Sequence, residues 1–320
     1  MKRTSVYGYY LVGVFAIAIT KTSFAQLSLA ADDAPVDPLW KHPATVSYVK
    51  NGDGTSNTKI DAVIRYKWLL TATGDTKTAS QSSYSLAGYT HHDNNGAKPR
   101  DDRGISAGFS QTFIPEFDNS AGPRSVTLNA KLSVGNTLEE FKSPAGIPLR
   151  EDRTKDRQLV QVTGYYQTPL SGTPPDSSAA LPTLFSGQRQ VLYFLGNLGA
   201  YSDHSSGGNG DGTGRLSGGV ASIDANWAPF GIDPAGLRLA GLGFVPTARL
   251  AAQVQHDAHS SGSRKKDTYR LYTVGISLAF TKLDAGTLVP TLTLQRSIGA
   301  DILAGRPDTA KTEIAFGLTF

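Results

Sequence analysis

The sequence predicts an all-β chain that closes into an antiparallel up-and-down transmembrane β-barrel of about twelve strands, with a range of ten to fourteen. Three observations predict it. Apolar and polar residues alternate along most of the chain, the alternation recurs in segments of strand length, and after residue 25 no apolar run is long enough for a membrane helix. Side chains of a strand point to opposite faces in turn, so each segment has one apolar and one polar face. A closed barrel places hydrocarbon against the first face and water against the second.

Five segments alternate clearly, and they cover residues 60–70, 125–134, 248–255, 272–280 and 288–295. In the first of them, one face carries only apolar or aromatic residues, namely Ile60, Ala62, Ile64, Tyr66, Trp68 and Leu70. Weaker alternation marks further segments at about 44–50, 79–90, 104–114, 157–168, 189–201 and 215–228. The last strand of the chain brings the number to twelve, and an even number suits a barrel with both termini on one side of the membrane. A further segment at 236–246 widens the range.

The chain ends on an apolar strand, in which Ile314, Phe316, Leu318 and Phe320 share one face. An unpaired strand of this kind invites aggregation in a soluble protein, whereas barrel closure gives it a partner. The ending resembles that of bacterial outer-membrane β-barrel proteins of the porin-like type, whose assembly machinery recognises a last strand with a terminal Phe. The resemblance points to no specific family. It implies that Phe316, Leu318 and Phe320 form the assembly signal and that the barrel-assembly machinery is a partner.

The beginning of the chain reads as an export signal. Lys2 and Arg3 precede an apolar run over residues 9–19, and small Ser23 and Ala25 flank Phe24 before an expected cleavage after Ala25. The alternative is a single N-terminal anchor helix, for which the apolar run is short. We therefore expect three parts: 1–25 a cleaved signal peptide, 26–40 a short periplasmic leader, and 41–320 the barrel. The expected location is the outer membrane of a Gram-negative bacterium.

Charge and cysteine content exclude several classes of function. The chain has 31 basic and 27 acidic residues, and the signal segment holds Lys2, Arg3 and Lys21 but no acid, so the remainder is almost neutral. No nucleic-acid partner is expected from this balance. There is no cysteine, which excludes disulfides and thiolate metal sites and is consistent with passage through the periplasm. We expect no cofactor and no metal.

The polar face of the strands is the candidate functional surface. Charges of both signs on it imply water in the lumen, because an isolated buried charge is costly. Five bases against three acids favour anions. Twelve strands enclose a narrow pore, so the predicted function is passive diffusion of small hydrophilic solutes without catalysis. In the alternative, the charges pair across the lumen and close it. The predicted pore-lining residues are Lys59, Asp61, Arg65, Lys67, Asn129, Lys131, Asp224, Arg249, Gln253, Gln255, Thr293, Gln295 and Glu313.

Outer connections of such a barrel are expected to be longer and more polar than inner ones. We expect them at residues 91–103, 137–156, 202–214, 256–268 and 297–310. Two of them carry His, Ser and Asp together, the residue types of nucleophilic hydrolysis. His259 and Ser261 also resemble the His-x-Ser site of outer-membrane phospholipases, but that family continues Asn-Gly where this chain has Gly262 and Ser263. A hydrolase is therefore an alternative function, and a polar outer loop is the simpler interpretation.

Two other motifs have simple interpretations. Residues 51–55 and 209–213 share the sequence Asn-Gly-Asp-Gly-Thr, which favours hairpin turns over a Ca²⁺ loop, because no Glu follows at the required spacing. His91, His92 and Asp93 are adjacent, and adjacent residues rarely bind one metal ion. A third functional alternative is a non-conducting barrel that binds partners through residues 137–156 and 256–268. The expected partners are outer-membrane lipid, lipopolysaccharide and small polar solutes, and the oligomeric state is left open.

Overall fold

The structure is a computed structural model of the 320-residue chain. It describes residues 25–30, 34, 42–52, 54–74, 79–93, 100–114, 125–142, 148–168, 180–181, 190–207, 213–229, 238–239, 242–280, 289–300 and 310–319. Every structural statement below concerns these residues. Residues 1–24 of the predicted signal peptide (1–25) and the terminal Phe320 lie outside them.

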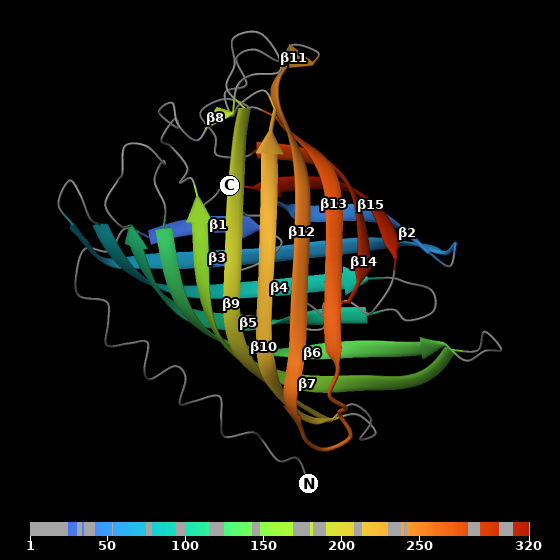
Figure 1. Cartoon of the computed structure of the whole chain (residues 1–320). Coiled ribbons are helices and arrows are strands. Elements are labelled where there is room, and N and C mark those ends of the chain that lie inside the picture. Colours follow the sequence, from blue (N-terminus) through green and yellow to red (C-terminus); the bar gives the residue numbers. More distant parts are fainter. Residues whose placement is uncertain are drawn as a thin grey trace.

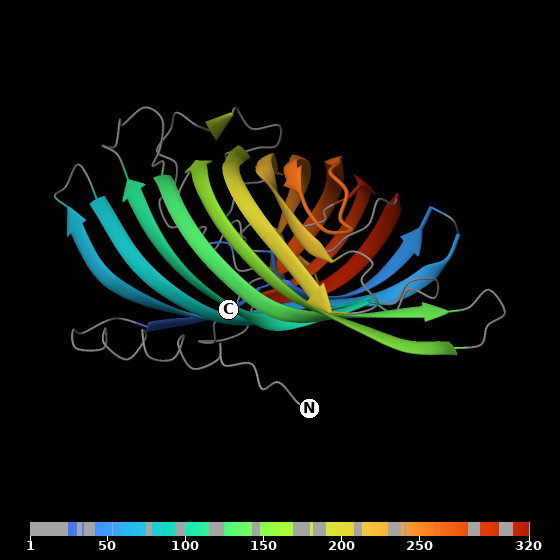
Figure 2. The same ribbon diagram turned by 90° about the horizontal axis from the view of Figure 1, so that it is seen from below.

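Within these residues, twelve antiparallel strands form one closed barrel, which confirms the predicted fold (Figure 1, Figure 2). Each strand pairs with its neighbours in the sequence, and β15 pairs with β2 to close the wall. Short β8 (Ala180–Leu181) and β11 (Arg238–Leu239) add to β9 and β12. The barrel strands are β2 (Ala44–Asn51), β3 (Ser56–Gly74), β4 (Ala79–Asp93), β5 (Arg100–Ile114), β6 (Ser125–Lys142), β7 (Pro148–Thr168), β9 (Gln190–Gly207), β10 (Gly214–Ala228), β12 (Leu242–Ser260), β13 (Thr268–Phe280), β14 (Val289–Gly299) and β15 (Lys311–Thr319).

The barrel is apolar outside and polar inside. Leu198 and Leu250 on the outer face are 71% and 65% exposed, whereas Asp61 on the luminal face is 2% exposed. A water-soluble domain shows the opposite distribution, because apolar side chains gain free energy when they leave water. An apolar exterior with a polar interior is the arrangement of a transmembrane barrel. No helix in the described ranges has the length and apolar character to cross a bilayer.

The two ends of the barrel differ, and we name them here. The terminal rim is the end at which β2 begins and β15 finishes, and the loop rim is the opposite end. The strands reach further toward the loop rim than predicted, because residues 91–93, 137–142, 148–156, 202–207 and 256–260 continue β4, β6, β7, β9 and β12. These residues were expected in loops because apolar alternation fades there. Backbone pairing does not need apolar side chains, so the ladder continues past the apolar band.

The segment expected as a leader differs from the prediction in its first residues. Residues 25–30 form β1 (Ala25–Ala30), which pairs with Val63–Trp68 of β3. The short β2 pairs with Ser56–Asp61, so β1 and β2 share one edge of β3. Leu27 on the outer face of β1 is exposed and Ser28 on its luminal face is buried, as on the wall strands. The alternation over residues 26–30 is too brief to stand out in the sequence.

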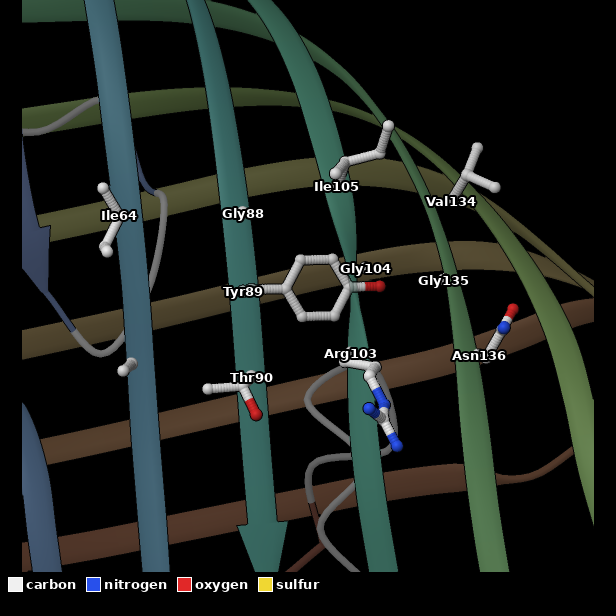
Figure 3. Close-up of a pocket in the computed structure, with 11 residues that line it drawn as sticks. Ile64, Gly88, Tyr89, Thr90, Arg103, Gly104, Ile105, Val134, Gly135 and Asn136 are labelled. Atoms are coloured by element: carbon white, nitrogen blue, oxygen red, sulfur yellow. The ribbon is translucent and has the colours of Figure 1, made fainter. Parts of the chain in front are cut away.

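An aromatic side chain braces the wall between β4 and β6. Tyr89 lies on the luminal face, and its ring crosses Gly104 of β5 toward Gly135 of β6 (Figure 3). A Cβ atom at either glycine would overlap the Tyr89 hydroxyl. Glycine at these positions therefore lets the ring lie flat against the backbone of two neighbouring strands.

Candidate functional site

The lumen is lined by small hydroxyl side chains interspersed with charges. The thirteen residues predicted to line the pore all lie on this face. They alternate along their strands with the exposed residues of the outer face. The charged residues that are almost fully buried there include Lys59, Asp61, Arg65, Asp224 and Glu313. Low exposure means that neighbouring side chains on the wall and nearby segments cover these charges closely. Their role in permeation stays a prediction.

The first luminal ion-pair cluster lies on β3 and β4 near the loop rim. Lys59 forms an ion pair and hydrogen bond with Asp61 Oδ2, two residues along the same strand. The other oxygen of Asp61 lies 3.0 Å from His91 Nδ1 on β4. The Asp61 carboxylate thus offsets the Lys59 charge.

The second cluster joins β10 to β12. The Arg249 guanidinium donates from Nε at 2.9 Å and from Nη2 at 2.6 Å to Asp224 Oδ2. Asn226 Nδ2 donates to Asp224 Oδ1 at 3.1 Å. His42 Nε2, just before β2, lies 3.7 Å from Asp224 Oδ2. His42, which precedes the first barrel strand β2, thus contacts the luminal face of β10.

Arg65 and Lys67 give β3 two positive charges at adjacent luminal positions. Successive residues on one face of a strand are separated by about 7 Å, so the two charges reinforce each other's potential. Arg65 Nη1 donates to the backbone oxygen of Ala34 at 2.7 Å. Its backbone neighbour across the ladder is Ser28 of β1.

Three described residues between β1 and β2 contact luminal groups. Ala34 accepts the hydrogen bond from Arg65, and His42 approaches Asp224. Pro43 packs against Gly317 of β15, where a Cβ atom would lie 2.6 Å from the proline Cγ. The chain thus meets the interior of the barrel at three points before it rejoins the wall at Ala44. No feature of the sequence predicted these contacts.

A third charged cluster lies in the lumen near the loop rim. Asp203 of β9 accepts from Arg157 Nε at 2.9 Å and Nη2 at 3.1 Å. Arg264, in the turn between β12 and β13, donates to Asp203 Oδ2 at 2.9 Å and to its backbone oxygen at 3.0 Å. One carboxylate therefore binds two guanidinium groups and links the turn between β12 and β13 to β9.

Beside this cluster the lumen contains an apolar group and a second buried acid. Leu159, Tyr201 and Leu216 pack together in the interior. The Tyr201 hydroxyl donates to Asp257 Oδ1 and accepts from Gln255 Nε2 at 3.0 Å. Of these groups and the Asp203 cluster, sequence analysis named only Gln255, because residues 202–214 and 256–268 were read as loops. Continued alternation through Asp203 and Asp257 could have placed both inside.

The residues considered for hydrolysis are not assembled as a catalytic site. His259 is exposed, and the Ser261 hydroxyl accepts a 3.1 Å hydrogen bond from the Arg215 backbone amide. His256 Nδ1 pairs with Thr268 Oγ1 at 2.8 Å. No hydrogen bond between a histidine and a serine hydroxyl is among those described for this part of the chain. These contacts are those of polar residues at and beyond the end of β12, and the hydrolase stays an alternative hypothesis.

The structure also addresses the two motifs considered for metals. His91 is luminal and His92 points outward, since neighbours alternate along β4. Gly54 has φ 86° and donates its amide to Asn51 O at 3.1 Å, as expected for a hairpin turn at residues 51–55. Within the described residues, no group of three or more potential metal ligands occurs. The second copy of the motif falls mainly outside them.

A shallow depression of about 580 Å³ lies on β3–β6 (Figure 3). Ala62, Ile64, Ile105 and Val134 line it, and Gly88 leaves its floor without a side chain. Its lining belongs to the outer face and is apolar on one side, with Thr90, Arg103 and Asn136 on the side of the loop rim. It therefore lies outside the lumen.

Several solved barrels resemble this structure. The beta domain of the Bordetella autotransporter Brka is 8% identical, with 93% of this chain and 99% of that chain covered and a TM-score of 0.48. The translocator domain of NalP from Neisseria meningitidis is also 8% identical. The match covers 98% of this chain and 94% of that chain, with a TM-score of 0.44. An outer membrane channel from Pseudomonas putida F1 is 12% identical. The match covers 90% of this chain and 99% of that chain, with a TM-score of 0.40.

No protein-family model matches the sequence, and no curated protein matches it. The resemblance to solved barrels is too distant to assign a function. The lumen of this chain is therefore the feature from which a function can be inferred.

Proposed function

We propose that the protein is an outer-membrane channel for passive diffusion of small hydrophilic solutes, with a preference for anions. The observation that carries the proposal is the predominantly polar lining inside an apolar wall, as far as the strands are described. Polar side chains facing inward stabilise water in the lumen, and lumen charge sets which ions enter. The chemistry at this lining is binding and passage, with no catalytic step.

The arrangement of luminal charges supports the anion preference. Lys59 and Arg249 are offset by Asp61 and Asp224. Lys67 lies at the next luminal position to Arg65 on β3, and its positive charge adds to the potential there. An anion that passes this level gains electrostatic free energy, whereas a cation loses it. A barrel of twelve strands encloses a narrow lumen, so the proposed solutes are small.

The test is current through single proteins in planar bilayers. We expect discrete conductance steps and, under a salt gradient, a reversal potential with the sign of anion preference. Lys67→Glu should lower the ratio of anion to cation permeability by about twofold or more, because it replaces a luminal positive charge with a negative one. Lys266→Glu makes the same change in an exposed turn and should leave the ratio nearly unchanged. Folded protein that never conducts would overturn the proposal.

One observation favours a second candidate, a non-conducting barrel with a surface-binding role. Arg264 folds from its turn onto Asp203, and Leu159, Tyr201 and Leu216 pack inside the same end of the lumen. Together these groups narrow the barrel near the loop rim. The bilayer experiment separates the two candidates, since a closed barrel gives no current in any salt.

A further inference from the structure

Charges on the outer face of the barrel are confined to one end. Among strand residues whose side chains are described, every outward Lys, Arg, Asp or Glu lies in the half of its strand nearer the loop rim. The terminal half of the outer face, as far as it is described, carries apolar, aromatic and hydroxyl groups and the amide of Gln111, but no charge. These outward charged residues are Lys50, Asp101, Arg103, Asp156, Arg215, Arg270 and Arg296.

The charges are also divided by sign around the barrel. On β5, Arg103 donates to Asp101 at 3.3 Å, so these two charges neutralise each other. On β7, the outward charge is the acid Asp156. On β10, β13, β14 and β2, the described outward charges are Arg215, Arg270, Arg296 and Lys50, all positive. The outward charges described on the strands of this side are therefore all positive.

Two of these cations lie on either side of a hydroxyl on three adjacent strands. Arg296 of β14 is directly opposite Thr312 of β15, and Thr312 is directly opposite Lys50 of β2. We call these three residues the Lys50–Arg296 patch. Adjacent strands are about 4.8 Å apart, so the Lys50 and Arg296 backbones are separated by roughly 10 Å. Two long side chains at this separation can reach one phosphate group between them.

Apolar surface adjoins the patch on its membrane side. One step toward the terminal rim on the same three strands lie Tyr48, Ile314 and Leu294, which are 55%, 52% and 44% exposed. The nearest carboxylate along β15, that of Glu313, lies on the opposite, luminal face. The outer surface therefore offers a cationic position directly above an apolar one, which is the layout of an amphiphile with a phosphate headgroup and acyl chains.

We propose that the Lys50–Arg296 patch binds lipid A, the phosphorylated and multiply acylated anchor of lipopolysaccharide. A phosphate would lie between the Lys50 ammonium and the Arg296 guanidinium with the Thr312 hydroxyl as a donor, and the acyl chains would cover Tyr48, Ile314 and Leu294. The inference rests on the outer-membrane location in the proposed function, because only there does the loop rim meet this lipid. Among the described residues no ion pair involves Lys50 or Arg296, and a phosphate would offset their charge where the surface borders hydrocarbon.

Native mass spectrometry of the detergent-purified full chain titrated with lipid A tests the proposal. Wild type should carry lipid A adducts, and Lys50→Gln with Arg296→Gln should weaken binding at least tenfold. Each single substitution should weaken it by a smaller factor, which keeps the test open if the double variant folds poorly. Lys265→Gln with Lys266→Gln removes two cations from an exposed turn and is the matched control. Heat-modifiable gel migration reports that each variant is folded.

Two other lipids separate the phosphate of lipid A from general adhesion. Dephosphorylated lipid A should bind wild type weakly, and phosphatidylglycerol should bind less tightly than lipid A. The proposal is wrong if the double variant binds as wild type does, if the dephosphorylated form binds equally well, or if phosphatidylglycerol binds as tightly. Failure here is distinguishable from failure of the channel, because adducts are measured without any current.

Discussion

At the scale of single residues, Asp203 is the acid near the loop rim that pairs with two arginines. Its carboxylate accepts hydrogen bonds from both Arg157 and Arg264, and it is almost completely buried. Removing one partner from a buried ionic cluster costs more than the interaction itself contributes, because the remaining charges stay desolvated. This acid therefore matters for stability as well as for the shape of the lumen.

Asp203→Asn should lower the free energy of unfolding by about 2 kcal/mol, because two guanidinium groups lose their shared anion. Urea unfolding in detergent measures it. Asp101→Asn breaks an ion pair whose Arg103 side chain is 69% exposed, and it should change the free energy by less than about 1 kcal/mol. Equal effects of the two substitutions would contradict the burial argument.

Residue types predicted on which face of the barrel wall each side chain lies. They did not predict which side chains form hydrogen bonds with each other. All thirteen residues chosen as pore-lining lie on the luminal face, because alternation alone fixes the face. The pairing of Arg249 with Asp224 on the neighbouring strand depends on register, which the sequence leaves open. The luminal places of Asp203 and Asp257 were missed, since the strands were assumed to stop where apolar residues stop.

At the scale of elements, β1 completes the wall beside β3. Residues 56–61 of β3 pair with β2, and residues 63–68 pair with β1. Without β1, the second stretch would present an unpaired edge inside the membrane-spanning wall, where unsatisfied backbone groups are costly. Six residues ahead of the barrel proper thus have a structural function.

Deleting residues 26–30 should expose the edge of β3 over residues 63–68. Backbone amides there that bond to β1 should exchange with deuterium faster, as measured by hydrogen-exchange mass spectrometry on folded protein. Residues 56–61 of the same strand are the internal control, because they pair with β2 and should keep their protection. Unchanged exchange at 63–68 would mean that β1 does not pair there in solution.

The sequence predicted the long strands because lipid imposes a strict period on them. The strands at 60–70, 125–134 and 272–280 each fall within one observed strand, β3, β6 and β13. β1 was read as part of a leader, since five residues give too little periodicity to identify a strand. Its assignment needed the register with β3, a contact between segments more than thirty residues apart.

At the scale of the whole molecule, the account depends on lipid outside and water inside one closed wall. The same alternation underlies the barrel and its polar lumen, and the channel proposal needs in addition that this lumen is open. The lipid A proposal uses only the outer face near the loop rim and can fail alone. The chain contains no cysteine, so single cysteines can be introduced without background.

Cysteine labelling along β14 tests this central point most directly. Thr293→Cys and Gln295→Cys are luminal, and Leu292→Cys and Leu294→Cys face outward on the same strand. In proteoliposomes, a small charged thiol reagent should modify the cysteines at 293 and 295 and spare those at 292 and 294, since thiolates form only where water reaches. Labelling that ignores the alternation, or that is absent from all four positions, would contradict a water-filled barrel in lipid.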